Sequence, residues 1–229
     1  MGFITDLLSD IPGFLIRLII VIFSLTIHEV AHGYAAYKMG DPTAKAFGRL
    51  SLNPLKHLDP LGFLCMLFFR FGWAKPVPIN TRYFKKPRQG MAVSALAGPV
   101  ANILMSFIGL LFYKLTLTLW YNGVFTVDTK FAENLVGLVL TFFQAFCVLN
   151  LYLGVFNLIP VPPLDGSRIL FVVLPDKLYF GIMKYEQYIQ IALIVLLYLG
   201  LLSGPLSALC GVILDGMEWL IELIPFFKL

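Results

Sequence analysis

Charged residues are scarce in this sequence: only 13% of its 229 residues are Asp, Glu, Lys or Arg. Soluble domains carry roughly 25%. Hydrophobic residues make up 59% of the chain, and the mean hydropathy is +0.85. So little charge excludes an ordinary soluble globular protein. We therefore predict an all-α polytopic membrane protein.

The sequence also lacks a polar linker, an internal repeat and a low-complexity tract. Residues 1–229 are therefore expected to form a single domain, with a core over about 11–175 and a C-terminal helical hairpin over about 186–228. Asp6 and Asp10 stand where a cleaved signal peptide carries basic residues, so residue 1 is expected in the mature protein. Three isolated cysteines lie in apolar surroundings: Cys65, Cys147 and Cys210. Their spacing predicts free thiols rather than disulfides or a cysteine metal site.

Acidic residues are especially scarce between Lys38 and Arg88. This window holds ten of the 17 basic residues but only two acidic ones, Asp41 and Asp59. A basic window between apolar segments could indicate a nucleic-acid partner, but the positive-inside rule explains it more simply. No nucleic-acid partner is therefore expected. Residues 38–90 and the later loop around residue 165 are predicted to be cytoplasmic, with the N-terminus outside.

The long apolar runs predict four or five transmembrane helices. Gly40 is expected to end the first of them in a left-handed conformation. The last run contains acidic residues, so it could either span the membrane or lie as a helix along the membrane interface. The predicted ranges are about Ile11–Met39, Met91–Trp120, Ala132–Ile159, Ile189–Leu202 and Pro205–Phe227.

Between the first two spans, prolines at six positions exclude a continuous helix. The apolar stretch "LGFLCMLFFRFGW" is too short to span the membrane with roughly 18 residues, and is predicted to be re-entrant or interfacial. The stretches "KAFGRLSLN" and "KPVPIN" are expected to be short extended segments at the membrane surface.

The stretch "SLTIHEVAHGY" places ionisable groups inside the first apolar run. His28 and His32 are one helical turn apart, and Glu29 projects from nearly the same side. In H-E-x-x-H, two imidazoles hold zinc and the carboxylate acts as general base. The alternative is a pair of helix-packing histidines, which would leave Glu29 without a purpose.

A catalytic zinc site requires a third protein ligand. On physical grounds Asp165 is the best candidate, because the prolines of "IPVPPLDG" hold the chain open at the end of an apolar span. A helix N-cap is the alternative role for Asp165. The other candidate ligands are Asp41, His57 and Asp59.

Two separated motifs, "HEVAH" and "NLIPVPPLDG", resemble those of the site-2 protease family of intramembrane zinc metalloproteases. The resemblance extends to "AGPVAN" and "GRLSLNPLKHLDPLG" and covers roughly residues 20–175. The second of these stretches resembles the small prokaryotic branch of the family. The sequence departs from better-known members because it shows no PDZ domain, no nucleotide-sensing CBS domain and no membrane span before the motif helix.

The resemblance implies that His28, His32 and Asp165 bind one Zn²⁺ per chain and that Glu29 is the catalytic base. It also implies a multi-pass protein of the cell membrane that cleaves transmembrane proteins or peptides in regulated intramembrane proteolysis. Asn157 matches the family's asparagine near the metal, where it could stabilise an oxyanion. Its alternative is a bond to a carbonyl freed by Pro160.

Two further residues have competing interpretations. Asn102 could contact the site or could serve as packing glue between helices, which we favour. His57 could touch substrate, bind a second metal or cap a turn with Asp59. For the whole chain, a metal transporter or a non-proteolytic scaffold remains the alternative to a protease, although a transporter has no need of Glu29 as a ligand and usually shows repeated halves. The oligomeric state cannot be inferred.

Overall fold

The computed structural model describes residues 10–69, 72–124 and 129–227 of the chain. Within these residues, four helices are long and apolar enough to cross a membrane, and a bent pair makes a possible fifth. The all-α polytopic prediction is therefore confirmed. Residues 70 and 71 of the predicted re-entrant stretch lie outside the described residues, as does Asp6.

The first span, α2 (Ile11–Lys38), begins and ends where the sequence predicts. Asp10 accepts a hydrogen bond from the Gly13 amide at 2.9 Å, which satisfies one of the free donors of the first turn. At the other end, Gly40 has φ of 110°, a conformation that favours glycine. The predicted left-handed stop is confirmed.

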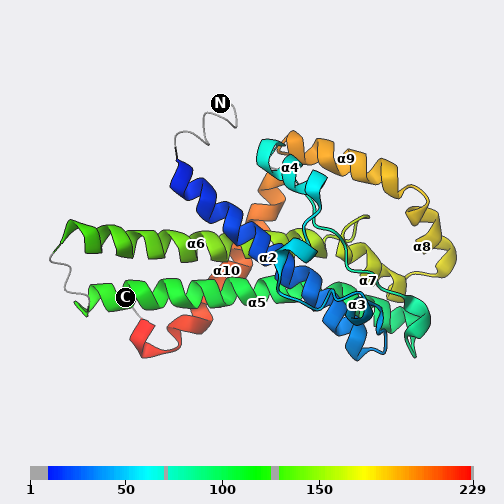
Figure 1. Ribbon diagram of the computed structural model, residues 1–229, viewed down its shortest axis with the longest axis horizontal. Helices are drawn as coiled ribbons and strands as arrows, with labels where there is room; N and C mark the ends of the chain where they lie inside the picture. Colours follow the sequence, from blue (N-terminus) through cyan, green and yellow to red (C-terminus); the bar gives the residue numbers. More distant parts are fainter. Residues whose placement is uncertain (1–9, 70–71, 125–128, 228–229) are drawn as a thin grey trace.

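The two longest helices, α5 (Pro87–Tyr121) and α6 (Lys130–Leu158), run side by side, and α2 crosses them (Figure 1). The close approach uses a small residue, because a Cβ at Gly154 would lie 3.0 Å from the Pro99 carbonyl oxygen. Pro160, two residues beyond the last helical residue of α6, cannot continue the helix. This break starts the turn toward residue 165.

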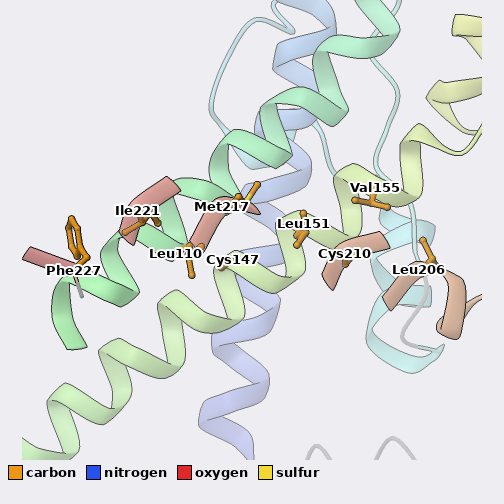
Figure 2. Packing of buried hydrophobic residues seen from close by; sticks show 9 residues of the cluster. All are labelled: Leu110, Cys147, Leu151, Val155, Leu206, Cys210, Met217, Ile221 and Phe227. Carbon is orange, nitrogen blue, oxygen red and sulfur yellow. The ribbon is translucent and has the colours of Figure 1, made fainter. Parts of the chain in front are cut away.

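Four helices complete the chain: α7 (Asp165–Val173), α8 (Asp176–Met183), α9 (Glu186–Tyr198) and α10 (Ser203–Glu222). The axes of α8 and α9 differ by 61°. The last helix, α10, packs on α5 and α6 and supplies much of the apolar core (Figure 2). The cluster comprises Leu110, Cys147, Leu151, Val155, Leu206, Cys210, Met217, Ile221 and Phe227.

The connection between α2 and α5 is mostly irregular, with a ten-residue helix, α4 (Pro60–Phe69), at its centre. The prediction of extended chain over residues 45–53 is wrong at its start. There Asp41 accepts the Thr43 amide at 2.9 Å and initiates a helical turn, α3 (Thr43–Ala46). Residues 75–80 form neither a helix nor a strand, Asn80 has an extended backbone, and one antiparallel bridge joins Leu58 to Ala74. Short 3₁₀ turns occupy Pro54–Lys56, Thr81–Tyr83 and Pro225–Phe227.

Candidate metal centre

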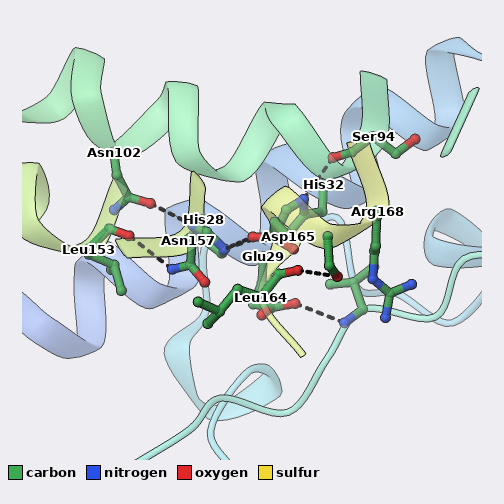
Figure 3. A network of polar contacts seen from close by, with 12 residues as sticks. His28, Glu29, His32, Ser94, Asn102, Leu153, Asn157, Leu164, Asp165 and Arg168 are labelled. Carbon is green, nitrogen blue, oxygen red and sulfur yellow. Dashed lines mark hydrogen bonds and ion pairs between the residues drawn. The ribbon is translucent and has the colours of Figure 1, made fainter. Parts of the chain in front are cut away.

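The two histidines of α2 and the aspartate that begins α7 converge on one point (Figure 3). The Nε2 atoms of His28 and His32 are 2.9 Å apart. The Asp165 Oδ2 atom lies 3.1 Å from the first and 3.2 Å from the second. Residues 137 positions apart in the sequence thus present three potential metal ligands to the same small volume.

These separations fit a tetrahedral zinc ion. Ligands at about 2.0–2.1 Å from zinc are separated from one another by about 3.3 Å. Among the residues that the structure describes, no other group of three His, Cys, Asp or Glu side chains brings ligand atoms this close together. Two imidazoles and one carboxylate also leave a fourth position for water, as a catalytic zinc site requires.

Asp165 is well suited to ligation as a carboxylate. Its side chain is only 17% exposed, and one of its carboxylate oxygens lies within 3.2 Å of the Nε2 atoms of both imidazoles. Asp165 is the first residue of α7, and Leu164 occupies the N-cap position. The carboxylate therefore faces the imidazoles rather than capping its helix.

A chain of amides across three helices fixes the proton of His28. The Phe146 carbonyl can only accept, so Asn150 donates to it through Nδ2 at 2.9 Å and accepts the Asn102 amide at 2.9 Å. The Asn102 Oδ1 atom then faces His28 Nδ1 at 2.6 Å and must accept its proton. Consequently the His28 Nε2 atom keeps its lone pair for a metal.

His32 is fixed in the same way by the backbone. Its Nδ1 atom donates to the Ser94 carbonyl oxygen at 2.7 Å, which leaves the Nε2 lone pair directed at the same point. Both histidines are nine-tenths buried or more. Such outer partners set the orientation and basicity of metal-binding histidines.

The three ligand candidates and Glu29 line a cavity of about 610 Å³. The Glu29 Oε2 atom accepts the Val77 amide at 2.8 Å, so this carboxylate is held by the loop between α2 and α5. Asn157 lines the same cavity. A nucleophile bound at the metal position would therefore share one cavity with a carboxylate and an amide.

Comparison of the sequence with known protein families shows which family has this arrangement. The model of the peptidase M50 family matches residues 16–200, which is most of the chain and includes both motifs. The chain belongs to peptidase family M50. This confirms the resemblance to site-2 proteases that the two motifs carry.

Relatives of this M50 peptidase include bacterial and archaeal proteins. YwhC of Bacillus subtilis, named as a candidate zinc metalloprotease, is 44% identical over 189 residues, 82% of this chain and 81% of that protein. Rip2 of Mycolicibacterium smegmatis, also named as a candidate, is 30% identical over 83% of this chain and 69% of that protein. The zinc metalloprotease MJ0392 of Methanocaldococcus jannaschii is 29% identical over 81% of this chain but only 42% of that protein. No solved structure matches the chain.

Family membership and the apolar helices together define a multi-pass membrane zinc metalloprotease.

The structure also gives the positions of the two asparagines that the sequence suggested for the site. Asn102 contacts His28 and is completely buried, so packing and site contact are combined in one side chain. Asn157 bonds the Leu153 carbonyl at 2.9 Å rather than a carbonyl freed by Pro160.

The remaining candidates for a third ligand lie outside the cavity lining. His57 is buried in the loop after α2, where its Nε2 atom donates to the Ser51 carbonyl at 2.7 Å. Asp59 accepts the Gly62 amide at the start of α4, at 2.8 Å. Asp41 accepts loop amides, including that of Asn80 at 2.6 Å. These three polar groups organise the loop.

Sequence reasoning missed two residues of the centre. Asn150 could have been found as a lone amide within an apolar span, where an unsatisfied polar group is costly. Gly98 gave a weaker signal, as one of the small residues of "AGPVAN" that permit close helix approach, and a Cβ there would lie 2.4 Å from His32 Nε2 and 2.7 Å from His28 Cε1. The imidazoles therefore occupy space that only a glycine on α5 leaves open.

Proposed function

We propose that this M50 peptidase is an intramembrane endopeptidase that cleaves transmembrane segments of other proteins in regulated intramembrane proteolysis. His28, His32 and Asp165 would hold one zinc ion, and Glu29 would act as general base. The convergence of these three ligand atoms, 2.9 to 3.2 Å apart beside Glu29, carries the proposal.

Zinc bound by these side chains would lower the pKa of a water molecule to about 7 and polarise a carbonyl oxygen. Glu29 follows His28 directly on α2 and lines the same cavity, so its carboxylate is within the enclosure to accept the proton of the attacking water. The same group would then return a proton to the leaving amine. The three ligands without such a base would bind a metal ion but would not supply general-base catalysis.

The peptide substrate must be extended at the bond that is cut. Every backbone amide of a membrane-spanning helix is paired, so its carbonyls become reachable only after local unwinding. Asn157 lines the cavity and presents an amide group there, which could stabilise the negative charge that develops on the carbonyl oxygen. Apolar residues lining the same cavity suit the side chains of a membrane segment: Leu25, Leu153 and Phe156.

The active site would open toward the cytoplasm. The basic loop between α2 and α5 and the turn before Asp165 lie at the same ends of the spans, in agreement with the positive-inside rule. At the opposite ends, Lys114 Nζ on α5 contacts Glu222 Oε1 at the end of α10, at 3.1 Å. The N-terminus and the end of α10 would then both lie outside.

The test uses the full-length chain, reconstituted with zinc in lipid vesicles together with a labelled transmembrane helix. Glu29→Gln should retain about one zinc per chain. Its cleavage rate should fall by about 10²- to 10⁴-fold, the usual contribution of a general base. Glu133→Gln, an exposed change at the start of α6, is the matched control and should cleave normally.

Two results would overturn the proposal. If the zinc-loaded wild type cleaves no transmembrane helix, metal transport or a scaffolding role takes its place. If Glu29→Gln cleaves as fast as the wild type, the base is another group.

A further inference from the structure

Three ionisable side chains outside the metal centre are almost fully buried, although they lie in the loop between α2 and α5. The exposed fractions are 0% for Asp41, 8% for Arg49 and 1% for His57. Burying such groups is unfavourable unless they are hydrogen-bonded. The proposed chemistry uses none of them, so their partners indicate what they do.

One short segment, residues 75–80, is held at both ends by these three residues. Asp41 and Arg49 use their side chains, and His57 uses its main-chain carbonyl. At its start, the Lys75 amide donates to the His57 carbonyl at 2.8 Å, and the Lys75 carbonyl accepts from Arg49 at 2.6 Å. At its end, the Asn80 amide donates to the Asp41 carboxylate at 2.6 Å. The segment is therefore fixed to the loop at two points.

Between these points the segment reads Pro76-Val77-Pro78-Ile79. Proline has no amide hydrogen and a fixed φ, so the first three of these residues are stiff and have a single main-chain donor, the Val77 amide. That amide donates to the Glu29 Oε2 atom at 2.8 Å. The N–H group between the two prolines is thus directed at the proposed base.

The Val77 side chain anchors the same contact. It is 8% exposed, and a Cβ at Gly33, one turn after Glu29 on α2, would lie 3.0 Å from its Cγ1 atom. Val77 therefore packs directly on the helix surface beside the carboxylate that it holds. A charge-assisted hydrogen bond of this kind is shorter and stronger than a neutral one.

We propose that residues 75–80, the Glu29 brace, position the general base, with the Val77 amide as the positioning group and Arg49 and Asp41 as its supports. This inference rests on the proposed function, because it takes Glu29 as the base. By holding Oε2, the brace leaves Oε1 to receive the proton. Small displacements of a catalytic group reduce rates strongly, which gives the brace a measurable effect.

Two substitutions at one position distinguish a positioning role of the brace from a role as cavity wall alone. Val77→Pro removes the amide hydrogen, whereas Val77→Ala keeps it and removes most of the apolar anchor. In zinc-loaded full-length protein, Val77→Pro should lower kcat by about tenfold to a hundredfold, while KM and zinc content remain near the wild-type values. Val77→Ala should lower kcat by less than about threefold. Equal kcat values for the two variants would overturn the proposal.

If Val77→Pro fails to fold, the supports give an independent comparison. Arg49→Met should lower kcat without loss of zinc, and Arg49→Lys should restore part of it by donating again to the Lys75 carbonyl. A loss of kcat that Arg49→Lys does not recover at all would contradict the positioning role.

A second measurement does not depend on activity. In ¹⁵N-valine-labelled protein, hydrogen exchange of the Val77 amide should be at least about tenfold faster in Glu29→Ala than in the wild type, since the acceptor is removed. Unchanged exchange would overturn the brace. This result holds even if the wild type cleaves nothing, in which case the proposed function fails and the Val77–Glu29 contact is still tested.

Discussion

Two buried polar regions meet at Glu29, and they are built differently. On the metal side, residues from α2, α5 and α6 are held by helix packing, and the amide chain from Asn150 through Asn102 ends at His28. On the loop side, the Glu29 brace is held by Asp41 and Arg49 and contains no helix.

The difference teaches how one site separates two requirements. Metal binding needs fixed lone pairs, which donors and acceptors on rigid helices supply. A proton acceptor needs a fixed carboxylate that is still open to the cavity, and a stiff proline-flanked segment can cover one oxygen while leaving the other exposed. Changes on the metal side should therefore affect zinc first, and changes on the loop side should affect turnover first.

The largest effect is expected from Asp165→Ala on the metal side. It removes one of three proposed ligands and leaves two imidazoles that cannot complete a site. Zinc affinity should fall by more than about a hundredfold, because even the loss of an outer partner costs ten- to a hundredfold. Titration against a zinc indicator measures this, with Asp176→Ala in α8 as the exposed control. Unchanged affinity would remove Asp165 from the site.

Gly98→Ala should have the next largest effect. The new methyl group would overlap the imidazoles of both histidines, and overpacking of this kind costs about 1–3 kcal/mol, which corresponds to roughly fivefold to 150-fold in zinc affinity. Gly137→Ala is the matched control, because nothing lies within 4 Å of a Cβ at that position in α6. The account of the site would be wrong if both variants bound zinc equally well.

Asn150→Leu tests the amide chain without touching a proposed ligand. It removes the acceptor of the Asn102 amide, so Asn102 can rotate and His28 is no longer held in one tautomer. Zinc affinity should fall by about tenfold, the lower end of the range for outer partners. Gln144→Leu, an exposed change on the same helix, should leave affinity unchanged. An equal effect of both changes would indicate that hydrophobicity, not the chain, is responsible.

The smallest effect is expected on the loop side, from Asp41→Asn. An asparagine keeps one oxygen that can accept the Asn80 amide, more weakly than a carboxylate, but its NH2 group replaces the oxygen that accepts the Thr43 amide. We expect kcat to fall by about threefold while zinc affinity is unchanged. A fall in zinc affinity with constant kcat would reverse the division between the two regions.

Sequence patterns predicted the parts of the structure that depend on local chemistry. Hydropathy predicted the helices, and Gly40 marked the end of α2 because a left-handed residue favours glycine. The spacing of His28 and His32 follows from helical geometry alone. These features need no knowledge of which segments meet.

The unpredicted parts depend on contacts between distant segments. Gly98 matters only because α5 passes within contact distance of the imidazoles, and the Val77 amide matters only because its loop returns to α2. The helical turn at Thr43–Ala46 replaced the start of an expected extended segment because Asp41 supplied a local acceptor. The sequence suggested Asp41 and His57 as possible metal ligands, and His57 also as a substrate contact or a turn cap, but their long-range partners were unknown.

X-ray absorption at the zinc edge identifies the atoms bound to the metal. We predict two imidazole nitrogens and one carboxylate oxygen around zinc in the wild type, with loss of imidazole scattering in His28→Ala and in His32→Ala. We also predict an unchanged ligand set in Glu29→Gln, where only the proposed base is altered. Zinc with fewer than two imidazoles in the wild type, or a spectrum that neither histidine change alters, would contradict the site.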